Sequence, residues 1–167
     1  MDPERCAECG FDATLLTTAD AITSLRSLGR RWRESFGDSP EDVLRRRPAP
    51  EVWSSLEYAG HTRDVLALIG YGLEQILDDT RPTFPAIESA PDAPDHGYNA
   101  LDADHVLAEL EANAERMAVR AERALPQHWS RTATIGDREV DAGWLIRHAV
   151  HDATHHLRDV EHILGRS

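Results

Sequence analysis

Apolar residues recur at alternating steps of three and four in four long stretches of the chain, which is the period of a helix with one buried face. The stretches cover about residues 14–36, 55–79, 103–125 and 142–164. Ser54 and Glu57 form a capping box at the start of the second stretch, and Asp141 is a suitable N-cap for the last one. The pattern therefore predicts an all-α fold, a four-helix bundle.

Two connections between the predicted helices bear on the topology. Residues 80–100 contain four prolines and no hydrophobic period, so we expect an unusually long loop between the second and third helices. A loop of this length can run along a bundle and leave those two helices parallel. Gly136 and Asp137 separate two short β-prone runs, residues 131–135 and 138–140, and predict a small β-hairpin just before the fourth helix.

Composition limits the class of protein. The chain has 167 residues, enough for one domain, with 41% apolar and 29% charged residues. No apolar run reaches the roughly 20 residues that cross a bilayer, and no basic stretch followed by an apolar one opens the chain, so we expect a cytoplasmic protein with no membrane partner. The net charge of −12 argues against nucleic acid as a partner. All 18 basic residues are arginines, which excludes lysine-based Schiff-base chemistry.

Histidine is concentrated in the fourth predicted helix, which holds five of the nine in the chain: His148, His151, His155, His156 and His162. Residues four apart lie on one face of a helix, so two metal-ligand pairs compete, His151 with His155 and Asp152 with His156. On a helical wheel the apolar residues fill one arc, with His156 inside it and Asp152 at its edge. His151 and His155 point away from the arc, toward solvent. Bundles build metal sites from inward side chains, so Asp152 and His156 are the better pair.

A third ligand should come from another helix. His61 is the only histidine of the second predicted helix, and it lies at the edge of that helix's apolar stripe. Together with Asp152 and His156 it would supply three nitrogen and oxygen ligands, while Asp159 is placed to orient one of them. Three protein ligands leave one position open, as in catalytic sites. Zinc suits this set best, although nickel, iron(II) and manganese accept the same ligand types.

The segments WSSLEYAGHTRDV, residues 53–65, and WLIRHAVHDATHHL, residues 144–157, resemble the DinB-like superfamily. Its relatives include mycothiol-dependent maleylpyruvate isomerases and bacillithiol transferases. The resemblance implies a four-helix bundle of up-down-down-up type that holds a divalent metal, usually zinc or nickel, with three side chains. His61 and His156 match two ligand positions. Asp152 occupies the third, where many members carry histidine and the mycothiol-dependent isomerases carry glutamate. A register with His151 and His155 as ligands would restore two histidines, but it requires the helix to turn by about 100°.

The resemblance also implies an activity, because family members with known activity use the metal to bind a thiol cofactor as its thiolate, a ready nucleophile. The leading hypothesis is a metal-dependent S-transferase or isomerase that joins a low-molecular-weight, mycothiol-like thiol to a small electrophile. The alternative is a non-catalytic metal- or small-ligand-binding bundle, a sensor or a scaffold, for which a homodimer is one arrangement. A structural site would be closed by a fourth protein ligand, whereas an enzyme would leave positions for water or substrate.

Cys6 and Cys9 form a single Cys-x-x-Cys in an N-terminal segment, residues 1–13, ahead of the bundle of residues 14–167. A zinc ribbon needs a second such pair, and the chain has no further cysteine. Four interpretations stay open: two reduced surface thiols, a redox pair, a metal half-site completed by a symmetry mate or a nearby histidine, and a resolving thiol for a metal-bound substrate. The tryptophans are expected to pack the core or the bundle ends rather than to bind a cofactor: Trp32, Trp53, Trp129 and Trp144.

Overall fold

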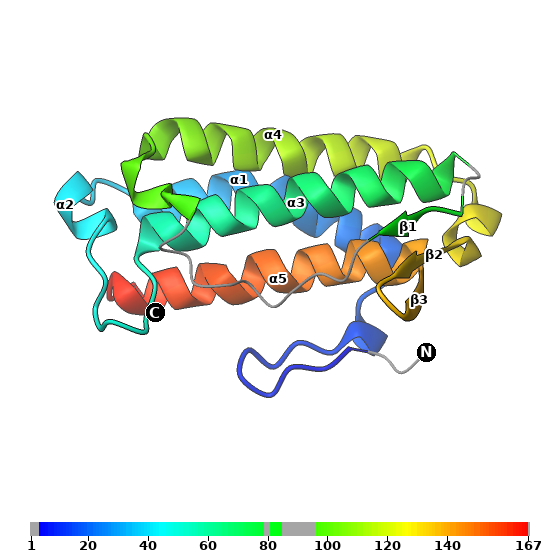
Figure 1. Ribbon diagram of the computed structural model, residues 1–167, viewed down its shortest axis with the longest axis horizontal. Coiled ribbons are helices and arrows are strands. Elements are labelled where there is room, and N and C mark those ends of the chain that lie inside the picture. The colour runs from blue at the N-terminus through cyan, green and yellow to red at the C-terminus, as the bar shows by residue number, and fades with distance from the viewer. Residues whose placement is uncertain (1–3, 79–80, 85–95, 167) are drawn as a thin grey trace.

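Four long helices lie side by side in the computed structural model, which describes residues 4–78, 81–84 and 96–166 (Figure 1). They are α1 (Thr18–Phe36), α3 (Ser55–Leu77), α4 (Ala103–Glu122) and α5 (Ala142–Ile163). Their apolar faces meet in one continuous core, in which the Trp32 side chain is fully buried. The four-helix bundle predicted from the hydrophobic period is therefore confirmed.

The helices have the up-down-down-up order. α3 and α4 run in the same direction, and α1 and α5 run in the opposite one (Figure 1). α3 packs against both α4 and α5, and α1 packs against the same two helices. This arrangement puts α3, which carries His61, directly beside the histidine-rich α5.

Local signals in the sequence define where the helices begin. The Ser54 hydroxyl accepts a hydrogen bond from the Glu57 N–H, and the Glu57 carboxylate accepts one from the Ser54 N–H, as the predicted capping box requires. The Asp141 carboxylate likewise accepts from the Trp144 N–H at the start of α5. The first helix begins later than expected, because Thr17 and Asp20 form a second capping box and residues 13–15 make a separate 3₁₀ turn, η1 (Ala13–Leu15).

A small sheet closes the end of the bundle where α5 begins. The predicted hairpin is present as β2 (Thr132–Ile135) and β3 (Arg138–Asp141), which pair antiparallel around Gly136. Gly136 has a φ of 62°, which favours glycine. A further strand, β1 (Thr83–Phe84), pairs parallel with β2. Its two residues are too few to show any alternation, so the sequence did not predict it.

Short elements fill the remaining described connections. They are α2 (Glu41–Leu44), η3 (Tyr98–Ala100) and η4 (Pro126–Ser130). The middle of the predicted long loop, residues 85–95, lies outside the described residues. None of the described helices combines the length and the apolar character needed to cross a membrane.

Candidate metal centre

The three predicted ligands come together between α3 and α5. Asp152 Oδ1 lies 3.8 Å from His61 Nε2 and 3.7 Å from His156 Nε2. One donor atom from each of the three lies within 4.8 Å of the other two, and their side chains are only 17–19% exposed. In the described part of the chain this cluster contains three donors, one carboxylate and two imidazoles. The helical wheel placed His156 inside the apolar arc and Asp152 at its edge, and in the structure both residues face His61 of α3.

The Asp152 carboxylate is the group that most needs a cation. Its Oδ2 atom is buried and has no hydrogen-bond partner among the described residues. Burial alone would raise the pKa of Asp152, but His61 and His156 outweigh it, and the net shift is downward. An anionic carboxylate with a free oxygen, facing two imidazoles, fits a divalent metal well.

A second carboxylate orients one of these imidazoles. Asp159 Oδ2 lies 3.0 Å from Nδ1 of His156. The contact leaves Nε2 of His156 directed at Asp152, 3.7 Å from its Oδ1. Metal-binding histidines usually donate their other ring N–H to a carboxylate in this way. The orienting position expected for Asp159 is therefore observed.

Two aromatic rings line the cluster, and the sequence did not identify either of them as part of the site. Trp53 has its ring 5.2 Å from that of His61, and Tyr58 has its ring 5.2 Å from that of His156. Burial, with the charges of Asp159 and Glu57 adding to it, raises the pKa of Tyr58, so its phenol stays protonated at neutral pH. Tyr58 lies one helical turn before His61, and this i, i+3 spacing is the signal that could have revealed it.

Tyr98 of η3 contacts α3 on either side of His61 in the sequence, at Gly60 and at Asp64. The Tyr98 ring packs on Gly60, so closely that a Cβ at residue 60 would lie 2.5 Å from Tyr98 Cδ1. The Tyr98 hydroxyl donates a hydrogen bond to Asp64 Oδ2 over 2.8 Å. Gly60 precedes His61, so η3 fixes α3 at the level of the candidate metal centre.

The expectation that His151 and His155 face solvent was wrong. Their side chains are only 14% and 21% exposed, because the N-terminal segment lies along this face of α5. Phe11 stacks on His151, with 4.5 Å between ring centroids and 12° between planes. The wheel described their position relative to the bundle correctly, but it could not include a segment from the other end of the chain.

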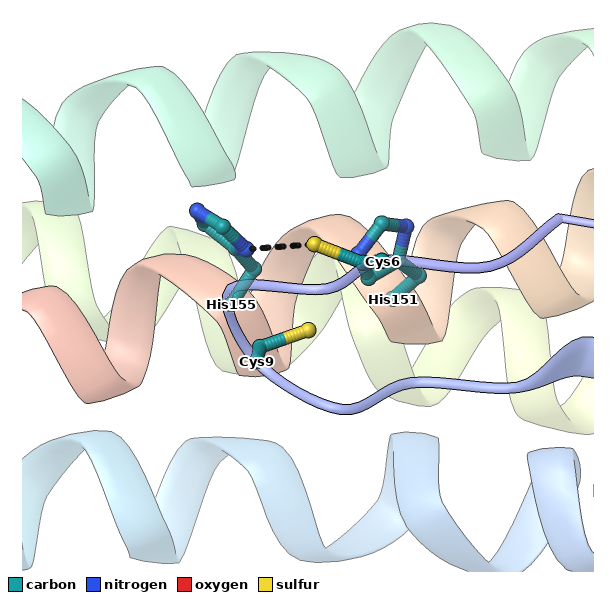
Figure 2. Close-up of side chains that lie close together, drawn as sticks. All are labelled: Cys6, Cys9, His151 and His155. Atoms are coloured by element: carbon teal, nitrogen blue, oxygen red, sulfur yellow. Dashed lines mark hydrogen bonds between the residues drawn. The ribbon is translucent and has the colours of Figure 1, made fainter.

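These two histidines meet the N-terminal cysteines, and we call this group the Cys2His2 cluster: Cys6, Cys9, His151 and His155 (Figure 2). Both cysteines are unpaired and partly buried. A hydrogen bond from the Cys9 backbone N–H is the largest influence on the Cys6 thiol, and it contributes to lowering the pKa of Cys6 to about 6. The structure therefore joins the Cys-x-x-Cys to two imidazoles within the same chain.

The fold and the carboxylate–imidazole cluster define a helical bundle with a candidate metal centre between its second and fourth long helices. The chain belongs to the DinB superfamily, whose family model matches residues 24–160. One similar solved structure is described as "YfiT from Bacillus subtilis is a probable metal-dependent hydrolase with an unusual four-helix bundle topology". It is 16% identical, the match covers 90% of this chain and 89% of that one, and the TM-score is 0.70. The comparison with curated proteins gave no match.

Proposed function

We propose that this chain is a metal-dependent enzyme of the DinB type, in which His61, Asp152 and His156 hold a divalent cation, with zinc the best fit. The observation that carries the proposal is the buried, unpartnered Oδ2 of Asp152 beside two imidazole Nε2 atoms. Three donors do not complete a tetrahedral site, so a position remains for a substrate. Bound there, zinc would supply Lewis-acid chemistry and favour the anionic form of a nucleophile.

The chain's own residues provide the rest of the site. Asp159 holds the imidazole of His156 in orientation through Nδ1. The protonated Tyr58 phenol can donate a hydrogen bond to an anionic substrate group. Trp53 and Tyr58 form an apolar wall, with 5.3 Å between their ring centroids, against which a small organic substrate can pack.

The reaction we propose is transfer of a low-molecular-weight thiol, such as mycothiol, to a small electrophile. The thiol loses its proton to solvent, its sulfur forms a bond to an electrophilic carbon, and the leaving group departs with its electron pair. The support for this choice is the three-ligand set with a carboxylate, which the chain shares by resemblance with thiol-using members of its superfamily. Mycothiol-dependent isomerases carry glutamate at the position of Asp152, and this shared carboxylate favours thiol transfer.

Hydrolysis is the second candidate, because the similar Bacillus subtilis structure is described as a probable metal-dependent hydrolase. It would use water where the first reaction uses a thiol, and it requires the same open position. Both reactions therefore require His61, Asp152 and His156 as metal ligands, and they differ only in the nucleophile.

A direct comparison of nucleophiles tests the proposal. Protein purified without a histidine tag is loaded with zinc and incubated with 1-chloro-2,4-dinitrobenzene and either mycothiol or cysteine, and in parallel with an activated ester and no thiol. We expect thiol conjugation above the rate of the metal-free protein. The variant His61→Ala should lose it, and the matched variant His105→Ala, which changes an exposed histidine of α4, should keep it.

Three other outcomes overturn the assignment in different ways. Ester cleavage without conjugation would replace thiol transfer by hydrolysis. Stoichiometric zinc at His61 with neither activity would leave a metal-binding bundle that is not an enzyme. If His61→Ala binds as much zinc as the wild type, His61 is not a ligand and the proposed metal site is wrong.

A further inference from the structure

A tight turn near the N-terminus presents two thiols to the outer face of α5. The Cys6 N–H donates to the Phe11 carbonyl over 2.9 Å, and the Gly10 N–H donates to the Cys6 carbonyl over 2.9 Å. Gly10 has a φ of 74°, which favours glycine at this point of the turn. Figure 2 shows the two sulfurs beside the imidazoles of His151 and His155.

We propose that the Cys2His2 cluster is a second zinc site, separate from the candidate metal centre, which fastens the N-terminal segment to α5. The site is closed, because two thiolates and two imidazoles complete a tetrahedron. Its role is structural, and the proposal does not depend on the activity proposed for the other centre.

The distances in the cluster are close to those of a bound site. In a tetrahedral zinc site with bonds of 2.0–2.3 Å, the donor atoms lie roughly 3.3–3.8 Å apart. Cys6 Sγ lies 3.7 Å from His155 Nδ1, and one donor from each of the four residues lies within 4.8 Å of the other three. Side-chain adjustments of about an ångström or less would complete the tetrahedron.

The two imidazoles are oriented as zinc ligands. His151 Nδ1 lies 2.7 Å from Glu4 Oε1, while its Nε2 is buried and has no hydrogen-bond partner among the described residues. His155 directs Nδ1 at Cys6 and has its Nε2 3.6 Å from a Glu8 carboxylate oxygen. Each ring thus offers one nitrogen to the sulfurs and has the other near a carboxylate, the arrangement that fixes histidine on zinc. A buried Nε2 without a partner is costly unless something binds it.

Spacing and charge agree with the same ligand. The cluster combines Cys-x-x-Cys with two histidines four apart on a helix, and both spacings recur in structural zinc sites. Two thiolates balance the charge of Zn²⁺, so the partly buried site would be neutral. The Cys2His2 cluster shares no residue with the cluster of His61, Asp152 and His156, so both can be filled at once.

Zinc here would close a loop that spans almost the whole chain. Cys6 belongs to the segment before η1, and His155 belongs to the last helix. Metal binding at such a site stabilises the ordered state of the segment, because the unfolded chain does not present the four donors together. Asp152 follows His151 directly in the sequence. Zinc at the Cys2His2 cluster would therefore also restrain the part of α5 that contributes Asp152 to the candidate metal centre.

Cobalt substitution tests the proposal on the full-length reduced protein. The chain has two cysteines, so a thiolate-to-cobalt charge-transfer band can arise only from Cys6 and Cys9. With excess phosphine reductant present, we expect this band together with the visible d–d bands of tetrahedral cobalt. The double variant Cys6→Ser/Cys9→Ser should lose the charge-transfer band, and His155→Ala should weaken it. The matched control His162→Ala, an exposed histidine of the same helix, should leave it unchanged.

Zinc content separates the two sites. We expect two zinc ions per reduced wild-type chain, one for each of the two separate clusters. Cys6→Ser/Cys9→Ser and His61→Ala should each retain one. Circular dichroism should show unchanged helix content in the cysteine variant, because the cysteines lie outside the bundle core.

Hydrogen–deuterium exchange of residues 4–12 measures whether zinc orders the N-terminal segment. Exchange should slow when zinc is added to the wild type, but not when it is added to the cysteine variant. The proposal is overturned if the reduced wild type shows no charge-transfer band, or if the cysteine variant binds as much zinc as the wild type. If the wild type shows the charge-transfer band but neither thiol transfer nor hydrolysis, the proposed function is wrong and the second zinc site stands.

Discussion

The carboxylate of Asp152 faces the imidazole of His61 across the α3–α5 interface, with 3.8 Å between Oδ1 and Nε2. The two residues lie on helices that run in opposite directions, so packing of the bundle, rather than proximity in sequence, creates this contact. Asp152 supplies the negative charge among the three donors, and its second oxygen has no other partner in the described structure.

Asp152→Asn should therefore weaken zinc binding at the candidate metal centre by more than about 100-fold, because it replaces an anionic ligand by a neutral amide. The measurement is competition with a chromogenic chelator. It is made in the Cys6→Ser/Cys9→Ser background, so that the second proposed site does not contribute. Asp137→Asn, in the exposed hairpin turn, is the matched control and should bind zinc as before. Equal affinity in the two variants would show that Asp152 is not a ligand.

Asp159→Asn should have a smaller effect, about 10- to 100-fold on zinc affinity. Asp159 is not one of the three proposed ligands, and its proposed role is to orient His156 through the contact of 3.0 Å between its Oδ2 and Nδ1 of the imidazole. Asparagine keeps a hydrogen-bond acceptor and removes the charge, so it should retain more affinity than Asp159→Ala. If both substitutions cost the same, orientation of the ring is not the role of Asp159.

Glu57→Gln should lower the free energy of unfolding by about 1–3 kcal/mol. The Glu57 side chain is 4% exposed, and its carboxylate accepts two hydrogen bonds from Arg47, at 2.7 and 2.8 Å, besides the one in the capping box. Chemical denaturation at pH 7 measures the change. Glu34→Gln, which alters an exposed pair with Arg30, should cost less than about 0.5 kcal/mol.

The same carboxylate gives the stability a defined pH dependence. Burial would raise the pKa of Glu57, but the Arg47 and Ser54 hydrogen bonds outweigh it and bring it below its usual value of 4.5. A depressed pKa means that the stabilisation is complete above pH 4.5 and is lost as the pH falls through the folded-state pKa. Between pH 6 and pH 3, the free energy of unfolding from chemical denaturation should fall less steeply for Glu57→Gln than for the wild type. Parallel pH profiles would contradict the assignment.

Gly60→Ala should destabilise the protein by about 1–3 kcal/mol, because the added methyl group would collide with the buried Tyr98 ring. Gly70→Ala on the same helix is the matched control. Its added Cβ would lie 3.5 Å from Met117 Cε, an ordinary contact, so the better helix propensity of alanine should leave it neutral or stabilise it by up to about 1 kcal/mol. Thermal denaturation compares the two. A Gly60→Ala variant as stable as Gly70→Ala would show that Tyr98 moves aside without cost.

Much of the fold was predictable because its determinants are local. The hydrophobic period of α4 is continuous along the helix, and the Ser54–Glu57 capping box lies within one turn, so neither depends on distant residues. The hairpin before α5 is also local, since Gly136 occupies the position that needs a positive φ. Strand β1 was not predictable, because two residues become a strand only when β2 lies beside them.

The candidate metal centre was predictable for a related reason. Asp152 and His156 lie four apart on one helix, and the wheel shows which side of that helix faces the core. His61 required only the assumption that the two helices are neighbours. Trp53 was missed, because nothing local distinguishes a tryptophan beside the candidate metal centre from one that packs the core, as Trp32 does. Tyr58 was missed although its i, i+3 spacing from His61 is a local signal.

By itself the sequence determined the helices, their caps and the inward face of α5, since each follows from residues a few positions apart. Only the tertiary structure decided that Cys6 and Cys9 lie against His151 and His155. Spacing rules for zinc sites expect the second pair of ligands to follow the first closely in the sequence. Here the first three long helices lie between the two pairs along the chain. The physical reason is that this meeting depends on how the N-terminal segment crosses the folded bundle, and no local pattern encodes that path.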